Sequence, residues 1–458
     1  MQTASVYAAG RTSVNVTSCF QLNRVCCYTE PSGIAGSGNS PEDVSSISLP
    51  VPDLAQLTSP NISHTIRTQV VTIIGDEHRI RAVAAVYFRT IHPWFPILAE
   101  GPFYDRLTHI LTYTSPDLSL LTLCMVLLGV KPVDHEIPPR MRSLYILLKG
   151  FIATLEAIEI NSLELLQCRL LLTIFEVGCG MYPAAYISMG ANVRAAVALG
   201  ANEVSKAQLE ETFKSPGRAD EARRIWRGIV ITDRYVSLES NKGPIISKAL
   251  LSGAVGGNDD FEAFDLTLTP SKPLYHFNKL AQASRILEQV LTHVHDPVQH
   301  MEFFNAEAMQ ILKTLKSFRG TVQDDYNVPH DLCCSAVAIS RSALMTILEF
   351  GCSLKVSGSE SCAAASYELL QDVIGELVNA SESFAAQITP ADLEVLPVFV
   401  VHSVYKAARL LLGVLRDSPK VDSRRAVSVL ENVLQCMGTR WVTGERYLDD
   451  LKRRKTAS

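Results

Sequence analysis

Apolar residues recur every three or four positions along most of the chain, which is the period of an α-helix. The segment after Asp76 shows this first. Asp76 is suited to cap a helix and His92-Pro93 to end one, because the residue before a proline avoids the α region. The shared apolar face of this segment consists of Ile80, Val83, Tyr87 and Ile91. No run of alternating apolar and polar residues competes with this period, so the pattern predicts an all-α fold.

The same period predicts helices through the rest of the chain. Asn161 with Glu164 forms a start similar to a capping box. Further helices are expected at about 273–295, 301–318, 331–350, 363–388 and 392–416, with polar loops at about 203–219, 251–272 and 319–330. A last helix keeps the spacing through Val427, Leu430, Leu434, Met437, Trp441, Leu448 and Leu451, with Gly444 at its one empty turn.

Residues 1–65 lack the helical period. Their only basic residues are Arg11 and Arg24, and prolines 31, 41, 50, 52 and 60 interrupt them. A segment of this composition buries too little apolar surface to offset the entropy lost on ordering. We therefore expect a disordered tail over residues 1–65 and one helical domain over residues 66–458.

Composition predicts a soluble protein of a reducing compartment. The chain is 47% hydrophobic with a net charge of -5, so no global field draws it to DNA or to an anionic membrane. The longest apolar stretch, Leu118–Val130, is shorter than the roughly 20 residues of a spanning helix and predicts a buried core helix. The N-terminus has no apolar run typical of a signal peptide. Eleven cysteines without even spacing predict free thiols, and no membrane partner is expected.

The usual motifs of catalysis are missing from the sequence. There is no Gly-x-Ser-x-Gly elbow, no Gly-rich phosphate loop and no His-Glu-x-x-His. The aspartate pairs at 259–260 and 324–325 lack a third acid and lie in loop-like stretches. His293 and His295 stand two apart on a predicted helix, so they point to different faces and do not chelate one metal ion. We therefore expect no catalytic residue, no metal centre and no enzyme activity.

Three cysteines in the tail resemble the closing portion of a fungal binuclear zinc cluster. Six residues separate Cys19 from Cys26, and Cys27 follows directly. Val16 stands where the preceding cysteine belongs, and the basic first half that reads DNA is missing. A structural zinc ion alone takes about four protein ligands. We therefore expect a degenerate remnant that holds no zinc, whereas intact relatives hold it; coincidental cysteines in a disordered tail are the alternative.

Segments across residues 78–450 resemble, in order and spacing, the regulatory domain of fungal transcription factors, also called the middle homology region. The similar segments are Tyr87–Leu98, Leu120–Gly129, Gly190–Gly200, Glu221–Trp226 with Asp233-Arg234, and Arg440–Tyr447. Two positions depart from the family pattern: Arg227 replaces a frequent second tryptophan, and Lys242-Gly243-Pro244 replaces Gly-Arg-Pro. The signature residues, which we interpret as structural, are His92, Pro93, Phe95, Pro96, Arg223, Arg224, Trp226, Asp233, Arg234, Gly243, Pro244 and Trp441.

Among these residues, Asp233 has the greatest need of a polar partner. On a helix it lies among apolar neighbours, close to the face of Trp226, and its own-helix neighbours at 229, 230, 236 and 237 offer no cation. Burying a carboxylate unpaired costs several kcal/mol or raises its pKa. We therefore expect an ion pair with another helix, with contact to a ligand as the alternative.

The resemblance implies a nuclear transcription regulator whose helical domain responds to a small-molecule effector or a partner, as a homodimer or heterodimer. It implies contact with DNA only indirectly or through a cluster missing from this chain. Two other classes stay open: a helical interaction protein with no role in transcription, and an all-α enzyme. The basic run Lys452–Lys455 fits either a nuclear localisation signal or a solvated helix end.

Overall fold

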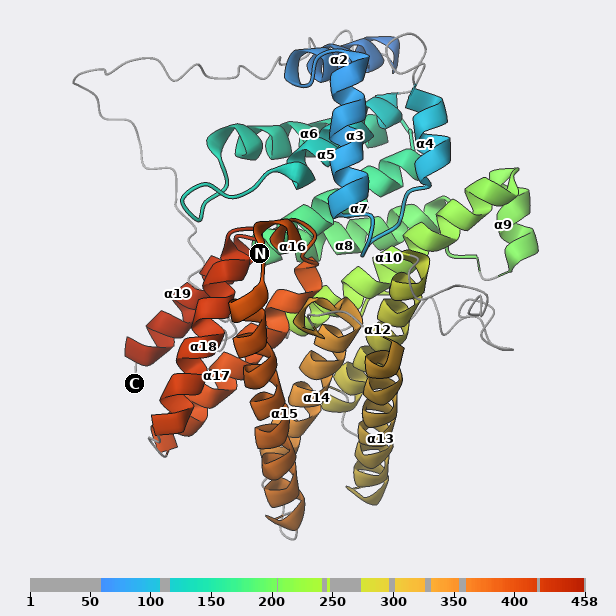
Figure 1. Ribbon diagram of the computed structural model, residues 1–458. Helices are drawn as coiled ribbons and strands as arrows, with labels where there is room; N and C mark the ends of the chain where they lie inside the picture. Colours follow the sequence, from blue (N-terminus) through green and yellow to red (C-terminus); the bar gives the residue numbers. More distant parts are fainter. Residues whose placement is uncertain are drawn as a thin grey trace, which may run out of the picture. The chain divides into compact units, whose positions relative to one another are not determined.

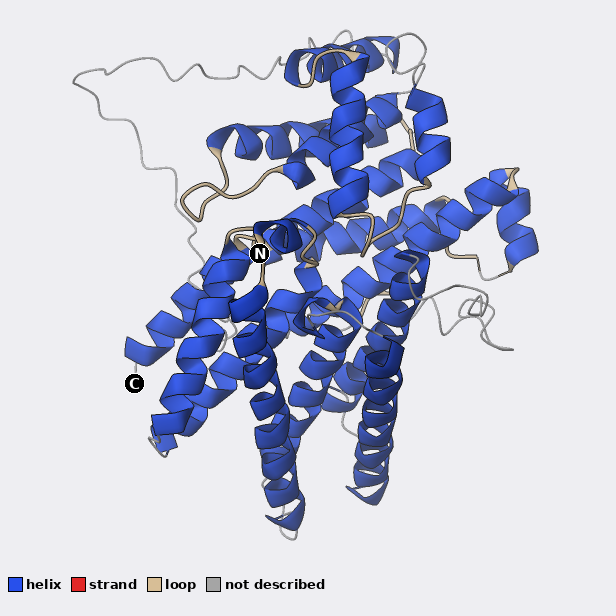
Figure 2. Ribbon diagram, viewed as in Figure 1, coloured by secondary structure: helices blue, strands red, loops and turns tan. Residues whose placement is uncertain are grey.

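The computed structural model describes residues 59–107, 116–203, 205–240, 245–247, 273–295, 301–325, 331–353, 360–417 and 421–456. Helices and loops alone make up these residues, with one isolated β-bridge between Val133 and Glu136 (Figure 2). The all-α prediction is therefore confirmed. The cysteines of the tail, the loop expected at about 251–272 with its aspartate pair at 259–260, and Gly243-Pro244 lie outside the described residues.

The helices follow the chain in this order (Figure 1): α2 Ser59–Ile73, α3 Glu77–Thr90, α4 Glu100–Leu107, α5 Pro116–Gly129, α6 Pro139–Ala157, α7 Leu163–Gly178, α8 Tyr182–Ala198, α9 Lys206–Phe213, α10 Pro216–Ser240, α12 Pro273–His295, α13 Met301–Asp325, α14 Ser335–Ser353, α15 Glu360–Gln387, α16 Pro390–Glu394, α17 Val401–Asp417, α18 Val421–Gly438 and α19 Thr443–Thr456. Two short 3-10 helices, Asp331–Cys333 and Val398–Val400, precede α14 and α17.

One continuous apolar core runs from Ile62 to Leu451. In the N-terminal half, α5 packs on α2, α3 and α7, and α7 packs on α8. The 25-residue α10 contacts α7, α8 and α12, so it links this half to a second group in which α14 lies against α12, α15 and α17. The α17–α18–α19 helices complete that group.

Capping residues account for several helix ends. Asp76 accepts a hydrogen bond from the backbone N–H of Arg79 (3.0 Å) at the start of α3, as predicted. At the start of α7 the predicted Asn161–Glu164 box does not form. Ser162 is the cap instead, and its hydroxyl accepts from the N–H of Leu165 (3.1 Å). Glu164 is unavailable because its carboxylate pairs with arginines.

Other helix boundaries differ from the predicted ones. The helix expected over 392–416 is divided into α16 and α17, because Pro397 cannot donate a backbone hydrogen bond and restricts the residue before it. The expected loop 203–219 contains α9 and the start of α10, and α13 continues to Asp325 through the loop expected from 319. The C-terminal pattern forms two helices, α18 and α19, joined by a turn that contains Trp441.

Two helices are apolar enough to raise the question of a membrane span. All of the stretch Leu118–Val130 except Val130 lies in α5, whose side chains are almost all buried, as predicted for a core helix. Ser335–Ser353 (α14) is the one helix among the described residues that is long and apolar enough to cross a membrane. It is 72% buried inside the protein, so it fits a core helix equally and is weak evidence for a span.

Candidate functional site

Two of the similar segments, the opening motif Tyr87–Leu98 and the C-terminal motif Arg440–Tyr447, meet in one aromatic cluster. Trp94 and Phe95, which follow α3, contact Phe399 from the 3-10 helix before α17, with ring centroids 5.9 and 6.0 Å away. Trp94 also lies edge-on to Trp441 (6.4 Å), and Phe95 lies edge-on to Phe277 of α12 (5.7 Å). All five rings are buried. The cluster therefore joins the opening motif to the C-terminal motif by packing.

The signature helix α10 crosses this cluster at close range. Trp226 is fully buried, and its indole Nε1 has no hydrogen-bond partner among the described residues. Two residues on, a Cβ placed on Gly228 would meet Ile97 at 3.0 Å and Phe95 at 3.1 Å. Glycine at this position therefore lets α10 approach the opening motif itself.

His92 lies within the electrostatic influence of Arg224. Burial and the nearby positive charge of Arg224 lower the pKa of His92 to about 4, so the imidazole is neutral at pH 7. Burial also lowers the pKa of Arg224 from its ordinary value, although Glu221 and Asp220 oppose the shift. Arg223 is on the outer side of α10, 3.5 Å from Asp220. Pro93 is partly exposed and Pro96 is buried.

Among the residues that the structure describes, Asp233 forms no ion pair with another helix, although we expected one. Its Oδ2 accepts a hydrogen bond from the backbone N–H of Ser247 (2.8 Å), so the carboxylate ties α10 to the segment 245–247. Burial raises the pKa of Asp233, and the Ser247 hydrogen bond opposes that rise. The cross-helix ion pair is made by the next residue, Arg234, which pairs with Glu288 and donates to Ser284 (2.9 Å), both in α12.

Arg440 and Trp441 hold the C-terminal motif against the N-terminal half. Arg440 is buried, donates to the carbonyls of Leu128 (3.0 Å) and Glu394 (3.2 Å), and stacks 4.0 Å from the Trp441 ring. Burial lowers the pKa of Arg440 to about 10. The Trp441 indole donates to the Leu396 carbonyl (2.9 Å), and a Cβ on Gly178 would clash with its ring. The cavity beside this motif measures about 20 Å³, too small for an organic ligand.

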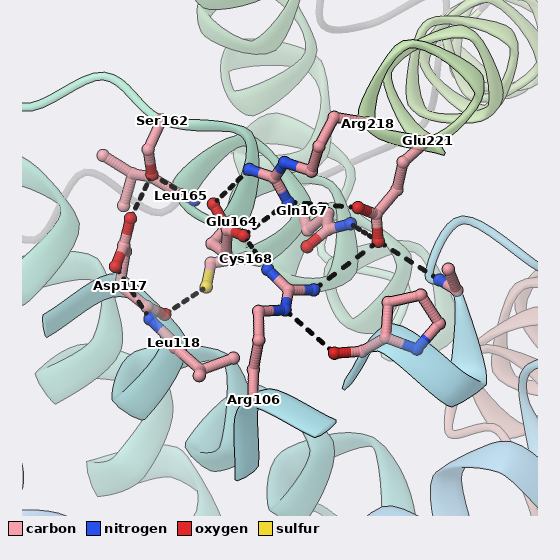
Figure 3. A network of polar contacts seen from close by, with 12 residues as sticks. Arg106, Asp117, Leu118, Ser162, Glu164, Leu165, Gln167, Cys168, Arg218 and Glu221 are labelled. Carbon is pink, nitrogen blue, oxygen red and sulfur yellow. Dashed lines mark hydrogen bonds and ion pairs between the residues drawn. The ribbon is translucent and has the colours of Figure 1, made fainter. Parts of the chain in front are cut away.

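An ion-pair network with buried carboxylates and partly exposed arginines joins α4, α7 and α10 (Figure 3). The Arg218 guanidinium donates two hydrogen bonds to the Glu164 carboxylate (2.6 and 2.9 Å) and one to Glu221 (3.1 Å). Arg106 also donates to Glu164 and lies 3.8 Å from Glu221. Glu221 further accepts from Gln167 (3.1 Å). Burial alone would raise the pKa of Glu164, but hydrogen bonds and charge from Arg218, with charge from Arg106, lower it overall.

A second buried polar cluster lies where α8, α10, α17 and α19 meet. The hydroxyls of Tyr182 and Tyr447 are 3.0 Å apart, and Tyr447 donates to Glu239. Tyr405 stacks on Tyr447 with ring centroids 4.1 Å apart. Burial raises the pKa of Tyr447 well above its usual range, and the charge of Glu239 adds to that rise. The sequence did not predict this cluster, because its members are spread from 182 to 447 and form no local motif.

Candidate metal sites do not assemble in the described part of the chain, where no three His, Cys, Asp or Glu side chains come together to hold an ion. His293 lies against Glu307 of α13 (Nδ1–Oε2 2.8 Å). The basic run at the end of α19 is paired with acids: Lys452 with Asp449 (3.3 Å), Arg453 and Arg454 with Asp450 (3.9 and 2.6 Å), and Lys455 with Glu431 (2.7 Å). This arrangement fits a solvated helix end.

Comparisons with known proteins relate this chain to fungal transcription factors. The family model described as a fungal specific transcription factor domain matches residues 84–335, more than half of the 458 residues. A transcription factor of Botryotinia fuckeliana (strain B05.10), BOA15, is 36% identical over 129 residues, which are 28% of this chain and 71% of that relative. No solved structure matches the chain. The family match covers the motifs from Tyr87 to Arg234, whereas Trp441 lies beyond it.

Proposed function

The chain belongs to the fungal specific transcription factor domain family, and on that premise we propose that its helical domain regulates transcription in the nucleus without making specific DNA contacts itself. The family is one of transcription factors and not of enzymes. The observation that carries the proposal is the family match over residues 84–335, whose motifs build the core around Trp226 and Phe95.

The proposed lack of specific DNA binding rests on charge and on the tail sequence. Specific binding needs cations for the phosphates and side chains placed on base edges. Residues 1–65 carry two arginines and three cysteines, Cys19, Cys26 and Cys27, and the chain is net negative. We interpret the cysteines as a degenerate remnant that holds no zinc. A partner, in a homodimer or heterodimer, or a separate DNA-binding module would supply the contacts.

The experiment is a reporter assay in a fungal cell. The full chain is fused to an unrelated DNA-binding domain whose sites precede the reporter. We expect the fusion to change reporter expression at least several-fold relative to the DNA-binding domain alone, because the helical domain would bring regulatory activity to the promoter. Immunoblotting and microscopy would establish equal abundance and entry into the nucleus.

A folded, nuclear fusion that leaves the reporter unchanged would contradict the proposal. That outcome would favour a helical interaction protein acting outside transcription. The fusion supplies its own DNA-binding module, so the result does not depend on whether the tail binds zinc.

A further inference from the structure

Five hydroxyl side chains in the sequence follow an arginine by three positions: Ser143, Ser237, Ser428, Thr443 and Thr456. Protein kinases with an acidic substrate cleft select this spacing, because the arginine pairs with the cleft while the hydroxyl reaches the bound ATP. The structure describes all five side chains and separates them. Ser237 and Thr443 are buried, and Ser143 is partly buried. Of the five, Ser428 and Thr456 are therefore the ones that solvent reaches freely.

Ser428 and Thr456 are both exposed, but they stand at different places in their helices. A kinase positions the hydroxyl in line with the γ-phosphate of ATP inside its own cleft, so the helix around the hydroxyl has to open. Ser428 lies in the middle of α18, next to Val427 and near Leu430, which are both buried in the core. Opening α18 there would expose these side chains to water. Thr456 is the last residue of α19.

The last turn of α19 opens at little cost. The final four carbonyls of a helix have no intrahelical N–H partner, and helix ends fray. The Thr456 hydroxyl donates to one of these carbonyls, that of Arg453 (2.9 Å). None of residues 452–456 belongs to the apolar core, whose last member is Leu451. Unwinding this turn therefore exposes no core side chain.

Positive charge surrounds Thr456. Residues 449–456 contain four cations and two aspartates, which gives a net charge of +2. Arg453 is 58% exposed, and its pair with Asp450 is long, at 3.9 Å. Exposed pairs of this kind contribute little to stability, so Arg453 can exchange Asp450 for a carboxylate of a kinase. Arg454 is held more closely by the same aspartate (2.6 Å), so the charge that the kinase recognises is that of Arg453.

We infer that Thr456 is a phosphorylation site for a serine/threonine kinase that recognises an arginine three residues before its target. The γ-phosphoryl group of ATP passes to the Thr456 oxygen, the hydroxyl proton passes to the catalytic base of the kinase, and ADP leaves. Such modification goes beyond the proposed role in transcription and does not depend on it.

The phosphate changes the electrostatics of the helix end. It brings a charge of about −1.5 to −2, which cancels most or all of the local charge of +2. Lys452 and Arg453, four and three residues before Thr456, share a helix face with the phosphate and are its nearest cations in the chain. Phosphorylation therefore turns a basic helix end into a nearly neutral one.

Phosphorylation of the purified full chain tests the inference. The probe is ATP with the catalytic subunit of cyclic-AMP-dependent protein kinase, which selects arginines before its target. We expect about one phosphate per chain. Mass spectrometry after proteolysis before Asp449 or Asp450 should place this phosphate on Thr456. Thr456→Val should incorporate at least tenfold less phosphate, whereas Thr456→Ser should still be modified.

Two arginine variants test the recognition. Arg453→Gln should lower kcat/KM for the chain as a substrate at least tenfold. The matched control is Arg425→Gln, which removes the arginine three residues before the exposed Ser428 and should change kcat/KM less than twofold. The replaced side chains lie outside the apolar core, so the variants should keep the circular dichroism spectrum of the parent.

Several outcomes would overturn the inference. Phosphate that remains in Thr456→Val, an unchanged kcat/KM in Arg453→Gln, or phosphate placed on Ser428 instead would each do so. The chain purified from cells in the presence of phosphatase inhibitors should carry the same phosphate. Its absence from Thr456, with the purified kinase or in the chain from cells, would also overturn the inference. The outcome is independent of the reporter assay, because it measures a covalent change in the chain itself.

Discussion

Replacing Trp226 with alanine is expected to lower the free energy of unfolding by about 3–5 kcal/mol, the usual cost of truncating a buried aromatic side chain. Trp226 is fully buried in α10, beside the close contact that Gly228 makes with Phe95 and Ile97. Neighbours packed this closely cannot collapse into the space that the indole leaves. Chemical denaturation of the purified chain, followed by circular dichroism, measures the loss.

Two variants make this measurement specific. Trp226→Phe should lose much less stability, because it keeps an aromatic ring at this position. Losing the indole N–H leaves no acceptor unpaired, since Nε1 has no hydrogen-bond partner among the described residues. Tyr367→Ala removes an aromatic ring from α15 that is 47% exposed, and it should change stability by less than about 0.5 kcal/mol. If Trp226→Ala unfolds at the same denaturant concentration as the parent, α10 is not part of the core.

Replacing Glu164 with glutamine is expected to cost about 1–3 kcal/mol at pH 7, because it takes the negative charge from between Arg106 and Arg218. Both arginines are about one-third exposed and can regain water, which limits the loss. The matched control is Glu368→Gln, an exposed glutamate of α15, which should have almost no effect.

The pH dependence of this loss follows from the lowered pKa of Glu164. A carboxyl group whose pKa is lower in the folded state stabilises the fold above its ordinary value of 4.5. That contribution is lost as the pH falls through the folded-state pKa. The difference in unfolding free energy between the parent and Glu164→Gln should therefore be largest at neutral pH and shrink below about pH 4. A difference that stays constant from pH 7 to pH 3 would contradict the ion-pair assignment.

The sequence predicted the helical fold because helical periodicity is a local property. The face after Asp76 and the apolar stretch in α5 were both readable from spacing alone. Breaks between helices were harder to predict. The apolar spacing from Val427 to Leu451 continues through the turn at Trp441. The residues at this spacing are buried on both sides of the turn, so the pattern does not reveal the break between α18 and α19. Pro397 was a readable signal for the break between α16 and α17, and the prediction of a single helix disregarded it.

The spacing of residues along the sequence did not predict which side chains contact each other in the folded protein. Asp233 was recognised as a buried carboxylate that needs a partner, but its partner is a backbone N–H at Ser247, which no side-chain pattern reveals. The network of Arg106, Glu164 and Glu221 joins residues more than 50 positions apart.

Promoter occupancy in living cells tests the central claim, that this protein acts in transcription, most directly. The measurement is chromatin immunoprecipitation of the tagged full chain from cells that express it at its normal level, with untagged cells as the control. The account predicts reproducible enrichment at a set of promoters, reached through a partner. A tagged protein that is present at normal abundance and enriched at no promoter above the untagged control would contradict it.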